Sequence, residues 1–501
     1  MPRYVYKTRP YVHQVRALKK LLRQQYGGAL LMAPRTGKTK VAIDWLAIKF
    51  KLREINRVLI ICPKFVMDVW EEQLEMHCPV PYEVYFWDRT ERKNGGIPPA
   101  GKRLLVVITN YEAFQTPGPK IKTNKVDDEG NPVYRRSTKK GRIANRNEVR
   151  RWCQGGKVAG ILDESHRIKS PGAAAARTII TTHAAFPYRI IATGTPITKK
   201  ARPHDAYQQW KWLNPVRFED FENLEDFKQY FGRWVKIKQV PVPLFKGSRH
   251  FAELKELMEM DAFSIDRDQC FDMEPDDVQE IPIKLSRSAR VYDDMAERMV
   301  SYIRQHTAEA SIPLVKVLRL AQITGGHVTT DKGQSIVVGT EKIDATMDLM
   351  RECIEHGERV VIAARFRPDL DLLYDKIRSM SRKLPVFEIR GGMKREEVTV
   401  GLKKARKITD NPLVYIVHPR AASLGIDLSF CSRMIWYSLT NSYVDYTQCC
   451  DRIALAPFRT YTYMLADGID RLLYEELQED GQIARAVIRN PERLFRRGRN
   501  E

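Results

Sequence analysis

The chain has 501 residues, with 84 Lys and Arg against 62 Asp and Glu, which gives a formal net charge of +22. Its 43% hydrophobic and 29% charged residues are typical of a well-packed globular protein of several domains and exclude wholesale disorder. A surplus of positive charge is typical of nucleic-acid-binding proteins, whose affinity comes largely from phosphate contacts. A solvated basic surface would give the same total charge.

The apolar stretches of the sequence are short. The longest, such as 28–33 and 58–62, fall far below the roughly 20 residues that span a bilayer, and the N-terminal region has no apolar signal core. We therefore expect no membrane segment and a cytoplasmic protein. The eight cysteines include no CxxC pair, which argues against a disulfide framework or a zinc ribbon.

Two sets of short apolar runs, each separated by helical patterns, predict an α/β fold with two parallel-sheet lobes. The runs lie at 58–62, 104–109, 160–164 and 189–193, and again at 359–364, 386–390, 414–418, 433–438 and 461–466. Amphipathic helical patterns dominate between the two sets. The expected division is a first lobe at 1–200, a helical insertion at 201–330, a second lobe at 331–490 and a basic tail at 491–501.

One segment of the expected first lobe, 116–151, is rich in Pro, Gly, Asn, Lys and Arg and nearly free of periodic apolar residues. This composition predicts a long basic loop. The loop is either a DNA contact or a solvated surface. Its candidate DNA-binding residues are Arg135, Arg136, Lys139 and Lys140.

A phosphate-binding loop is predicted at 32–39, MAPRTGKT, where an apolar run ends and a helical pattern begins. In such a loop the backbone N–H groups and the helix N-terminus hold phosphates, the Lys reaches the β and γ groups, and the Thr hydroxyl ligates Mg²⁺. An ordinary strand-turn-helix is the alternative, because Met32 and Arg35 depart from the usual pattern. The predicted nucleotide contacts are Arg35, Thr36, Gly37, Lys38 and Thr39.

A second apolar run ends in two carboxylates, Asp163 and Glu164. At the carboxyl end of a parallel strand such residues lie beside the phosphate loop of the same domain. Asp163 can then bind Mg²⁺ through water, while Glu164 orients or deprotonates the attacking water. The two motifs together predict an ATPase site.

In chain order these motifs resemble those of superfamily-two helicases, most closely the Swi/Snf-type DNA-translocating ATPases. Beside the two motifs above, RPYVHQ resembles the adenine-sensing motif, VLIICPKFVMDVWEEQL motif Ia, ITNYEAF the next DNA-strand motif and ATGTPITK motif III. Later in the chain GERVVIAARF resembles motif IV, RAASLGIDLS motif V and YTQCCDRIAL motif VI. The resemblance covers most of the chain.

The resemblance implies two RecA-like lobes that use ATP and Mg²⁺ to act on duplex or branched DNA. It implies catalytic roles for Lys38, Asp163, Glu164 and Arg452, with Thr39 and Asp163 at the metal. Gln14 would read adenine, and Gly425, Asp427 and Gln448 would add nucleotide contacts. The implied nucleic-acid contacts are Pro63, Lys64, Tyr111, Thr193 and Thr195.

Motif VI departs from the family pattern. The position of the second arginine in this motif is occupied by Leu455. Arg459 is the nearest arginine that could replace it at the nucleotide. Loss of such an arginine costs orders of magnitude in turnover in related enzymes. A nucleotide-gated DNA-binding clamp that hydrolyses little is therefore one alternative function, and an RNA helicase is another.

The length of the chain is similar to that of compact bacteriophage recombination helicases. This likeness implies branch migration or the remodelling of forks and recombination intermediates, in a bacterial or phage-infected cell. Partners from recombination or replication, and a monomer or weak oligomer, are the corresponding expectations.

Overall fold

The structure is a computed structural model of the whole chain. It describes residues 4–87, 98–115, 120–126, 132–136, 147–194, 196–197, 202–235, 244–271, 274–305, 311–329, 334–409, 411–422, 426–478 and 494. The chain divides into two compact units, here called the first and second lobes. The first consists of Met1–Val235 and Pro243–Phe271, and the second of Lys236–Val242 and Asp272–Glu501.

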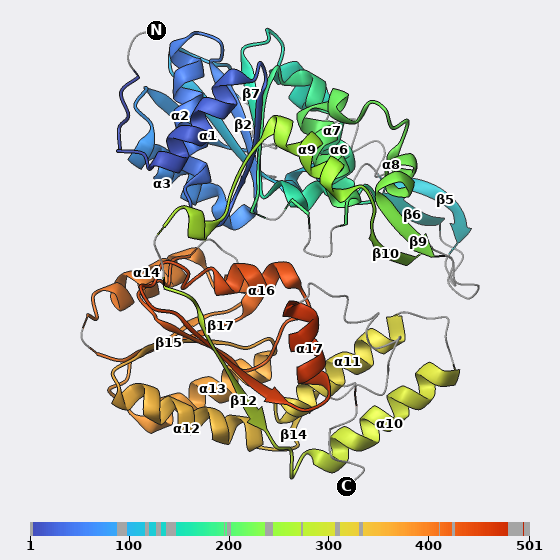
Figure 1. Cartoon of the computed structure of the whole chain (residues 1–501), viewed down its shortest axis with the longest axis vertical. Coiled ribbons are helices and arrows are strands. Elements are labelled where there is room, and N and C mark those ends of the chain that lie inside the picture. The colour runs from blue at the N-terminus through green and yellow to red at the C-terminus, as the bar shows by residue number, and fades with distance from the viewer. Residues whose placement is uncertain are drawn as a thin grey trace. The chain divides into compact units, whose positions relative to one another are not determined.

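The first lobe is built on a parallel sheet of seven strands in the order β11-β1-β8-β7-β2-β4-β3 (Figure 1). Every pairing in this sheet is parallel. The strands are β1 (Gly27–Met32), β2 (Arg57–Cys62), β3 (Tyr82–Phe86), β4 (Leu104–Asn110), β7 (Val158–Asp163), β8 (Tyr188–Ala192) and β11 (Ala262–Ile265). A parallel sheet needs helical crossovers, so helices follow most strands.

Both faces of this sheet are covered, which explains the continuous apolar runs of its central strands. Successive residues of β2 alternate between two cores: Val58 and Ile60 pack toward α1, α2 and α3, and Leu59 and Ile61 toward α6 and α7. The helices are α1 (Val12–Arg23), α2 (Lys38–Lys51), α3 (Met67–His77), α6 (Ala174–Ile180), α7 (His204–Leu213), α8 (Leu224–Phe231) and α9 (Phe251–Asp261). Three tryptophans of this lobe, Trp45, Trp210 and Trp212, are fully buried.

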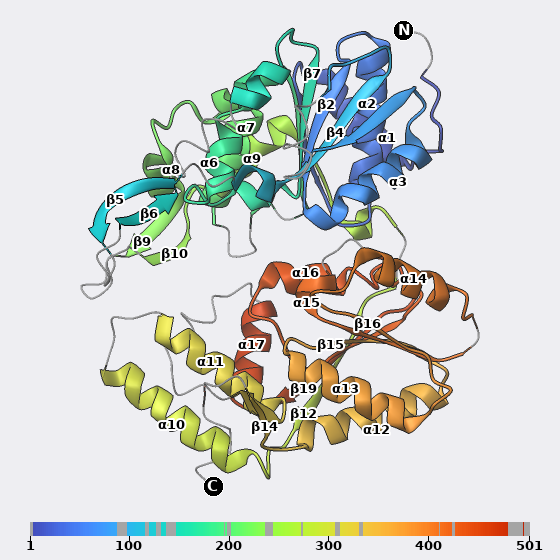
Figure 2. The ribbon, with the colours of Figure 1, turned by 180° about the vertical axis from the view of Figure 1, so that it is seen from behind.

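The second lobe is built on a parallel sheet of six strands in the order β12-β19-β18-β15-β17-β16 (Figure 2). Its strands are β12 (Asp277–Ile283), β15 (Arg359–Ala363), β16 (Val386–Ile389), β17 (Leu413–Val417), β18 (Arg433–Trp436) and β19 (Thr460–Ala466). The helices are α10 (Ala289–Gln305), α11 (Ser311–Thr324), α12 (Glu341–Glu355), α13 (Arg367–Met380), α14 (Arg395–Arg406), α15 (Pro419–Ala422), α16 (Tyr443–Cys450) and α17 (Ile469–Gln478). The two parallel-sheet lobes confirm the predicted fold class.

The predicted helical insertion at 201–330 is not a separate unit, and its boundaries are corrected by the structure. Strand β11 adds to the first sheet and strand β12 to the second, so the segment is divided at 271–272. Asp261, fully buried, joins the first part to its lobe, because its carboxylate accepts a hydrogen bond from the hydroxyl of Tyr26, the residue before β1. The sequence pattern missed these strands because β11 has four residues and β12 lies half-exposed at a sheet edge.

The predicted basic loop at 116–151 contains regular structure. Strands β5 (Lys120–Val126) and β6 (Pro132–Arg136) form an antiparallel pair in which Ile121 lies opposite Arg135. Residues 147–152 are helical, with Val149 buried. A second antiparallel pair in the first lobe joins β9 (Gly232–Val235) and β10 (Leu244–Ser248), and β13 (His327–Thr329) pairs with β14 (Ser335–Val337) in the second. Within the described ranges no helix is long and apolar enough to cross a membrane.

Candidate active site

The predicted phosphate loop connects β1 to α2, as expected. Gly37 caps the N-terminus of α2 with φ +88°, in the left-handed region that favours glycine. A Cβ at this position would lie 2.1 Å from Nε2 of Gln14, so the loop admits no side chain here. Arg35 also has a positive φ, +64°, although it is not glycine. The first turn of α2 therefore presents its N–H groups at the end of a tight loop, which is the geometry that binds phosphates.

The first turn of α1 holds this loop in place. Nε2 of Gln14 donates to the carbonyl oxygen of Thr36 at 3.1 Å, and Nε2 of His13 lies 2.8 Å from the same oxygen. Oε1 of Gln14 accepts from the backbone N–H of Tyr11 at 3.0 Å. Gln14 is thus buried against the phosphate loop, beside the predicted nucleotide position.

Lys38 is the first residue of α2, and its side chain turns back over the loop. Its ammonium group donates to the carbonyl oxygens of Met32 at 2.8 Å and Ala33 at 3.2 Å. Lys38 also contributes to the electrostatics of Asp163, whose pKa it lowers. The lysine and the first carboxylate of motif II therefore share one site at the carboxyl ends of β1 and β7.

Asp163 is held from two neighbouring elements. Its Oδ2 accepts from Nε1 of Trp70 on α3 at 2.9 Å, and its carbonyl oxygen accepts from the hydroxyl of Tyr111 at 2.7 Å. Its Oδ1 accepts from the backbone N–H of Glu164 at 3.1 Å. Both carboxylate oxygens are therefore oriented before any ligand binds.

Burial, together with the negative charge of Glu164, raises the pKa of Asp163 to about 6. The N–H of Trp70 and the ammonium of Lys38 oppose this shift. A carboxyl group with such a pKa favours a bound cation, because the cation stabilises the ionised form that burial disfavours.

Glu164 links motif II to motif III. It adopts a left-handed conformation, with φ +53° and ψ +51°, directly after β7. Its Oε2 lies 3.2 Å from Nδ1 of His166, which lies 3.1 Å from Oγ1 of Thr193. The backbone of Gly194 lies against the loop, since a Cβ there would be 3.0 Å from Cδ of Pro34. His166 therefore connects the second carboxylate of motif II to motif III within the first lobe.

These residues fit ATP with Mg²⁺. The left-handed glycine at the start of α2, the lysine over the loop and the buried carboxylate at the end of β7 are the three features that such a site requires. Thr39, the residue predicted to ligate Mg²⁺, is the second residue of α2, directly after Lys38. No cluster of three or more metal-ligating side chains occurs among the described residues.

Two of the predicted nucleic-acid contacts are buried inside the first lobe. Tyr111 is 3% exposed and its hydroxyl is bonded to Asp163, while Thr193 is 0% exposed and its hydroxyl contacts His166. Both side chains therefore support the catalytic residues, and their contact with nucleic acid stays a prediction. Pro63 is buried, and Lys64, at the start of a short turn after β2, is exposed.

Several predicted residues fall outside what the structure describes. Arg135 and Arg136 lie on β6, where only the backbone is described. The residues outside the described ranges are Lys139, Lys140, Thr195 and Gly425.

In the second lobe the predicted residues of motifs V and VI contact one another. Nε of Arg452 donates to the carbonyl oxygen of Gln448 at 2.6 Å, and its Nη1 donates to the carbonyl oxygen of Ile426 at 3.1 Å. Oδ1 of Asp427 accepts from the hydroxyl of Ser429 at 2.7 Å. Arg452 is 8% exposed, so its guanidinium holds the two motifs together within the lobe.

Arg459, the predicted replacement for the motif VI arginine, is bonded within the second lobe, and its role at the nucleotide stays a prediction. Its side chain is 3% exposed and forms a short ion pair with Asp276, and it also donates to the carbonyl oxygens of Glu274 and Ala456. These contacts attach Arg459 to the residues directly before β12, so its side chain stabilises the edge of the second sheet. Leu455 is 40% exposed.

Sequence reasoning missed the supporting role of two residues. Trp70 was part of a recognised motif, but nothing in the sequence indicates that its N–H reaches Asp163, because 93 residues separate them. His13 precedes Gln14 and shares its acceptor, the Thr36 carbonyl oxygen. The one signal in the sequence was their spacing from apolar residues of the same helix, which indicates that both side chains face the interior of the lobe.

Comparison with known families decides the identity of this site. Residues 13–271 match the SNF2-related domain, and residues 341–455 match the helicase conserved C-terminal domain. The first match alone covers more than half of the chain. The chain belongs to the SNF2-related family. As a member of this family it is a DNA-dependent ATPase, which confirms the expected enzyme class and the resemblance noted in the sequence.

Two solved structures are similar to this SNF2-related protein in fold. One is the Sulfolobus solfataricus SWI2/SNF2 ATPase core in complex with dsDNA, 18% identical, with 99% of this chain and 98% of that chain covered and a TM-score of 0.42. The other is the Sulfolobus solfataricus SWI2/SNF2 ATPase core domain, 18% identical, with 95% and 90% covered and a TM-score of 0.41. A search of curated proteins gave no match.

Proposed function

We propose that this protein is an ATP-driven motor that moves along duplex DNA and remodels branched DNA, such as forks and recombination intermediates. The observation that carries the proposal is the series of contacts from Asp163 through Glu164 and His166 to Thr193, at a site where the charge of Lys38 lowers the pKa of Asp163. In a DNA-dependent ATPase, such a connection lets the state of the nucleotide alter residues beyond the hydrolytic site.

The chemistry assigns separate tasks to the two carboxylates. Bound Mg²⁺ would neutralise charge on the phosphates of ATP. Asp163, fixed by Trp70, would help to hold that cation, and Lys38 would contact phosphate. Glu164 positions the attacking water and accepts its proton, while His166 holds the Glu164 side chain in place.

Glu164→Gln tests this division. The variant keeps the shape of the side chain and the contacts of Asp163, so we expect ATP to bind and hydrolysis to fall by about three orders of magnitude. A matched control is Glu112→Gln, which removes an exposed carboxylate bonded to Arg167 at 3.2 Å on the same lobe. Equal ATPase rates in Glu164→Gln and in the control would exclude Glu164 as the base.

Movement on DNA is tested by displacement of a third strand from a duplex carrying a triplex block. The steady-state ATPase rate with single-stranded, duplex, forked and four-way DNA, and with RNA, then ranks the substrates. We expect duplex or branched DNA to stimulate most and the third strand to be displaced only with ATP. Stimulation by RNA above all DNA substrates would favour an RNA helicase and contradict the proposal.

A second candidate function is a nucleotide-gated DNA clamp that hydrolyses slowly. Leu455 in the position of the second motif VI arginine favours it, and so does the bonding of Arg459 within its own lobe. The same triplex assay separates the two functions, because a clamp binds DNA with ATP but displaces no strand. We further propose a monomer or weak oligomer that cooperates with recombination or replication proteins.

A further inference from the structure

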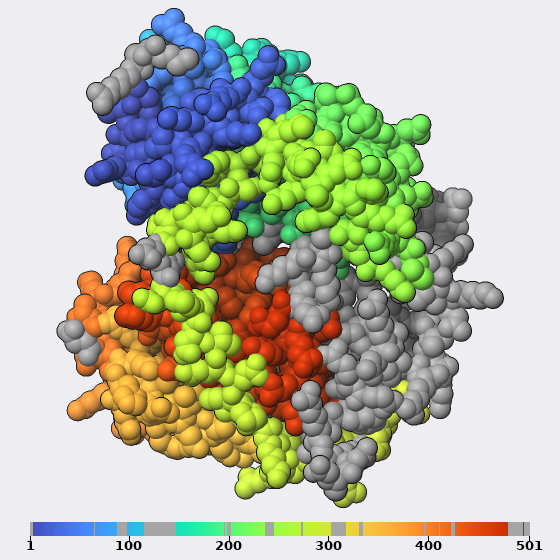
Figure 3. Space-filling view, viewed as in Figure 1, coloured from blue at the N-terminus to red at the C-terminus, as the bar shows by residue number. Residues whose placement is uncertain are grey.

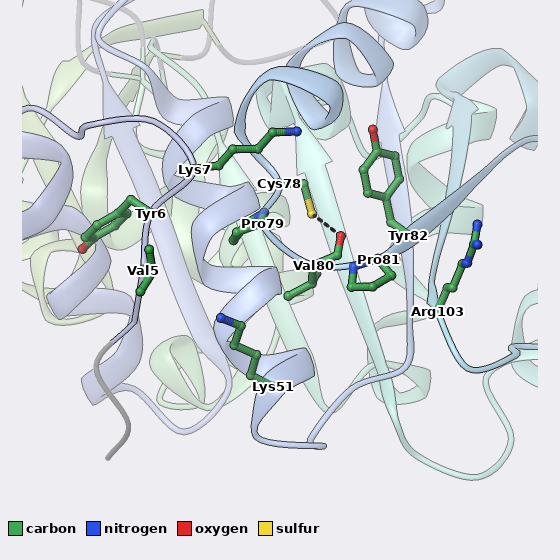
Figure 4. A pocket seen from close by; sticks show the side chains of 10 residues that line it. All are labelled: Val5, Tyr6, Lys7, Lys51, Cys78, Pro79, Val80, Pro81, Tyr82 and Arg103. Carbon is green, nitrogen blue, oxygen red and sulfur yellow. Dashed lines mark hydrogen bonds between the residues drawn. The ribbon is translucent and has the colours of Figure 1, made fainter.

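A basic pocket lies in the first lobe, away from the motifs that bind nucleotide. It has a volume of about 740 Å³, within the range of ligand-binding clefts. Figure 4 shows three cationic side chains, Lys7, Lys51 and Arg103, around the turn formed by Cys78, Pro79, Val80 and Pro81. Val5, Tyr6 and Tyr82 complete the lining. The described residues that line the basic pocket include no carboxylate.

The three cations contact neutral groups or an exposed carboxylate. Lys7 donates to the carbonyl oxygen of Glu75 at 2.5 Å, and the ammonium group of Lys51 lies over the ring of Tyr4 at 5.3 Å. Arg103 contacts Glu83 at 3.9 Å, with both side chains more than half exposed, so the pair contributes little. Two of the three cations thus contact neutral groups, and the positive charge is left for an anionic ligand.

The basic pocket is distant from the nucleotide loop. Lys51 is the last residue of α2, and Lys38 of the phosphate loop is the first. A helix of this length extends about 20 Å. Tyr82 and Arg103 lie at the amino ends of β3 and β4, whereas the catalytic residues lie at the carboxyl ends of β1 and β7. The surface formed by the N-terminal segment, α1 and α2 is the dark-blue part of Figure 3.

The strand that begins at the basic pocket is the last strand of the first sheet. Strand β3 pairs with β4 in parallel, with Tyr82 opposite Leu104 and Phe86 opposite Ile108. The N–H of Leu104 donates to the carbonyl oxygen of Pro81, and the N–H of Trp87 donates to the carbonyl oxygen of Ile108. The backbone N–H and C=O groups of the odd-numbered residues of β3 therefore point toward β4. The backbone groups of Tyr82, Val84 and Phe86 therefore point away from the sheet. Over the described part of the chain, no strand pairs with this β3 edge.

We propose that the β3 edge and the basic pocket together bind an extended acidic segment of a partner protein. The segment adds a strand to the sheet through the backbone groups of Tyr82, Val84 and Phe86, and its carboxylates contact Lys7, Lys51 and Arg103. A free sheet edge recognises a peptide backbone, which nucleic acid lacks. The apolar turn of Pro79, Val80 and Pro81 suits the side chains of such a peptide better than a phosphate backbone.

The test uses the full chain and a short fluorescent peptide of alternating glutamate and valine, with fluorescence anisotropy as the readout. Replacing the glutamates by glutamine removes the charge, and replacing the valines by proline removes N–H groups needed for strand pairing. We expect both altered peptides to bind roughly tenfold more weakly.

Protein variants separate the two parts of the surface. The pocket variant combines Lys7→Ala, Lys51→Ala and Arg103→Ala, and its matched control combines Arg16→Ala, Lys19→Ala and Arg23→Ala. The control cations are exposed on one face of α1 and do not line the basic pocket. Val84→Pro removes one outward N–H of the β3 edge while leaving the bonds to β4, and proline is tolerated at such positions.

The expected outcome is peptide binding that weakens roughly tenfold in the pocket variant and in Val84→Pro, and less than twofold in the control. DNA-stimulated ATPase near the wild-type rate would show that the variants fold; if Val84→Pro fails this check, the proline peptide alone tests the edge. Equal binding by the pocket variant and the control, or no peptide binding, would overturn the proposal. Self-association of the chain that Val84→Pro abolishes would also overturn it, because the β3 edge would then bind a second copy of the chain. A pocket variant that binds single-stranded DNA more weakly but binds the peptide normally would overturn it as well.

Discussion

The phosphate loop of the first lobe and the motif V–VI region of the second lobe both hold basic side chains against main-chain carbonyl oxygens. Lys38, only partly buried, bonds to two carbonyls of its own loop through a flexible ammonium group. Arg452 and Arg459 are 8% and 4% exposed, and each bonds to carbonyls from two segments of its lobe. A phosphate can replace the two contacts of Lys38 at low cost. The contacts of the arginines build the lobe itself.

This difference teaches that a motif position does not by itself tell whether a charge serves chemistry or structure. A phosphate-loop lysine must release its contacts to ligand, so it lies on a loop between a strand and a helix. An arginine that bonds several carbonyls satisfies groups that would otherwise be buried without partners. Substitutions in the two regions should therefore affect different quantities.

The largest effect is expected for Lys38→Ala. Turnover of ATP should fall by about three orders of magnitude, because the phosphate contact is lost while the helix that follows is unchanged. The rate of DNA-stimulated phosphate release measures it, with thermal unfolding as the check on the fold. DNA-stimulated turnover at the wild-type rate would contradict the phosphate-loop assignment.

Trp70→Phe tests the support of the hydrolytic carboxylate. The variant loses the N–H that donates to Asp163 Oδ2, so we expect kcat to fall roughly tenfold with a smaller change in KM. The matched control is Trp45→Phe, because Trp45 is equally buried in the same core but its Nε1 has no hydrogen-bond partner in the structure. If kcat falls by the same factor in both variants, the loss comes from altered packing, and the hydrogen bond from Trp70 has no role of its own.

Arg459→Ala should change stability and leave chemistry largely intact. It breaks a buried ion pair with Asp276 and two carbonyl contacts at the start of β12. Since Asp276 is 36% exposed, we expect a loss of roughly 1–3 kcal/mol in the free energy of unfolding, read from urea denaturation. A variant of normal stability whose kcat has dropped by orders of magnitude would restore Arg459 as the missing arginine.

The smallest effect is expected at Glu341, the first residue of α12. Burial alone would raise its pKa, but the backbone N–H groups of Ser288 and Ser286 lower that pKa to about 2. Because the pKa is lower in the folded state, the ionised Glu341 stabilises the fold at any pH above the pKa of the unfolded state. This stabilisation is lost as the pH falls through about 2.

Glu341→Gln should therefore cost about 1 kcal/mol near neutral pH, after allowance for solvent screening, and the difference from wild type should shrink between roughly pH 5 and 2. Urea denaturation at several pH values measures it. Glu355→Gln, an exposed change on the same helix, is the control. A difference that grows as the pH falls would show that the sign is wrong.

The sequence by itself determined the parts of this protein that depend on local pattern. Continuous apolar runs predicted the buried parallel strands, and the run-Gly-Lys-Thr-helix order predicted the phosphate loop, because both follow from backbone geometry and neighbouring residues. The carboxylates at the end of β7 were placed for the same reason. Strands β11 and β12 escaped prediction, since a short strand and a half-exposed edge strand leave no continuous apolar run.

Only the tertiary structure decided which polar side chains meet. Tyr111, Trp70 and Asp163 are far apart in the sequence and contact one another because α3, β4 and β7 carry them to one edge of the sheet. Arg459 and Asp276 are 183 residues apart and meet because β12 pairs with β19. A side chain's exposure and partners depend on elements that pack against it from elsewhere in the chain, and no local pattern encodes that packing.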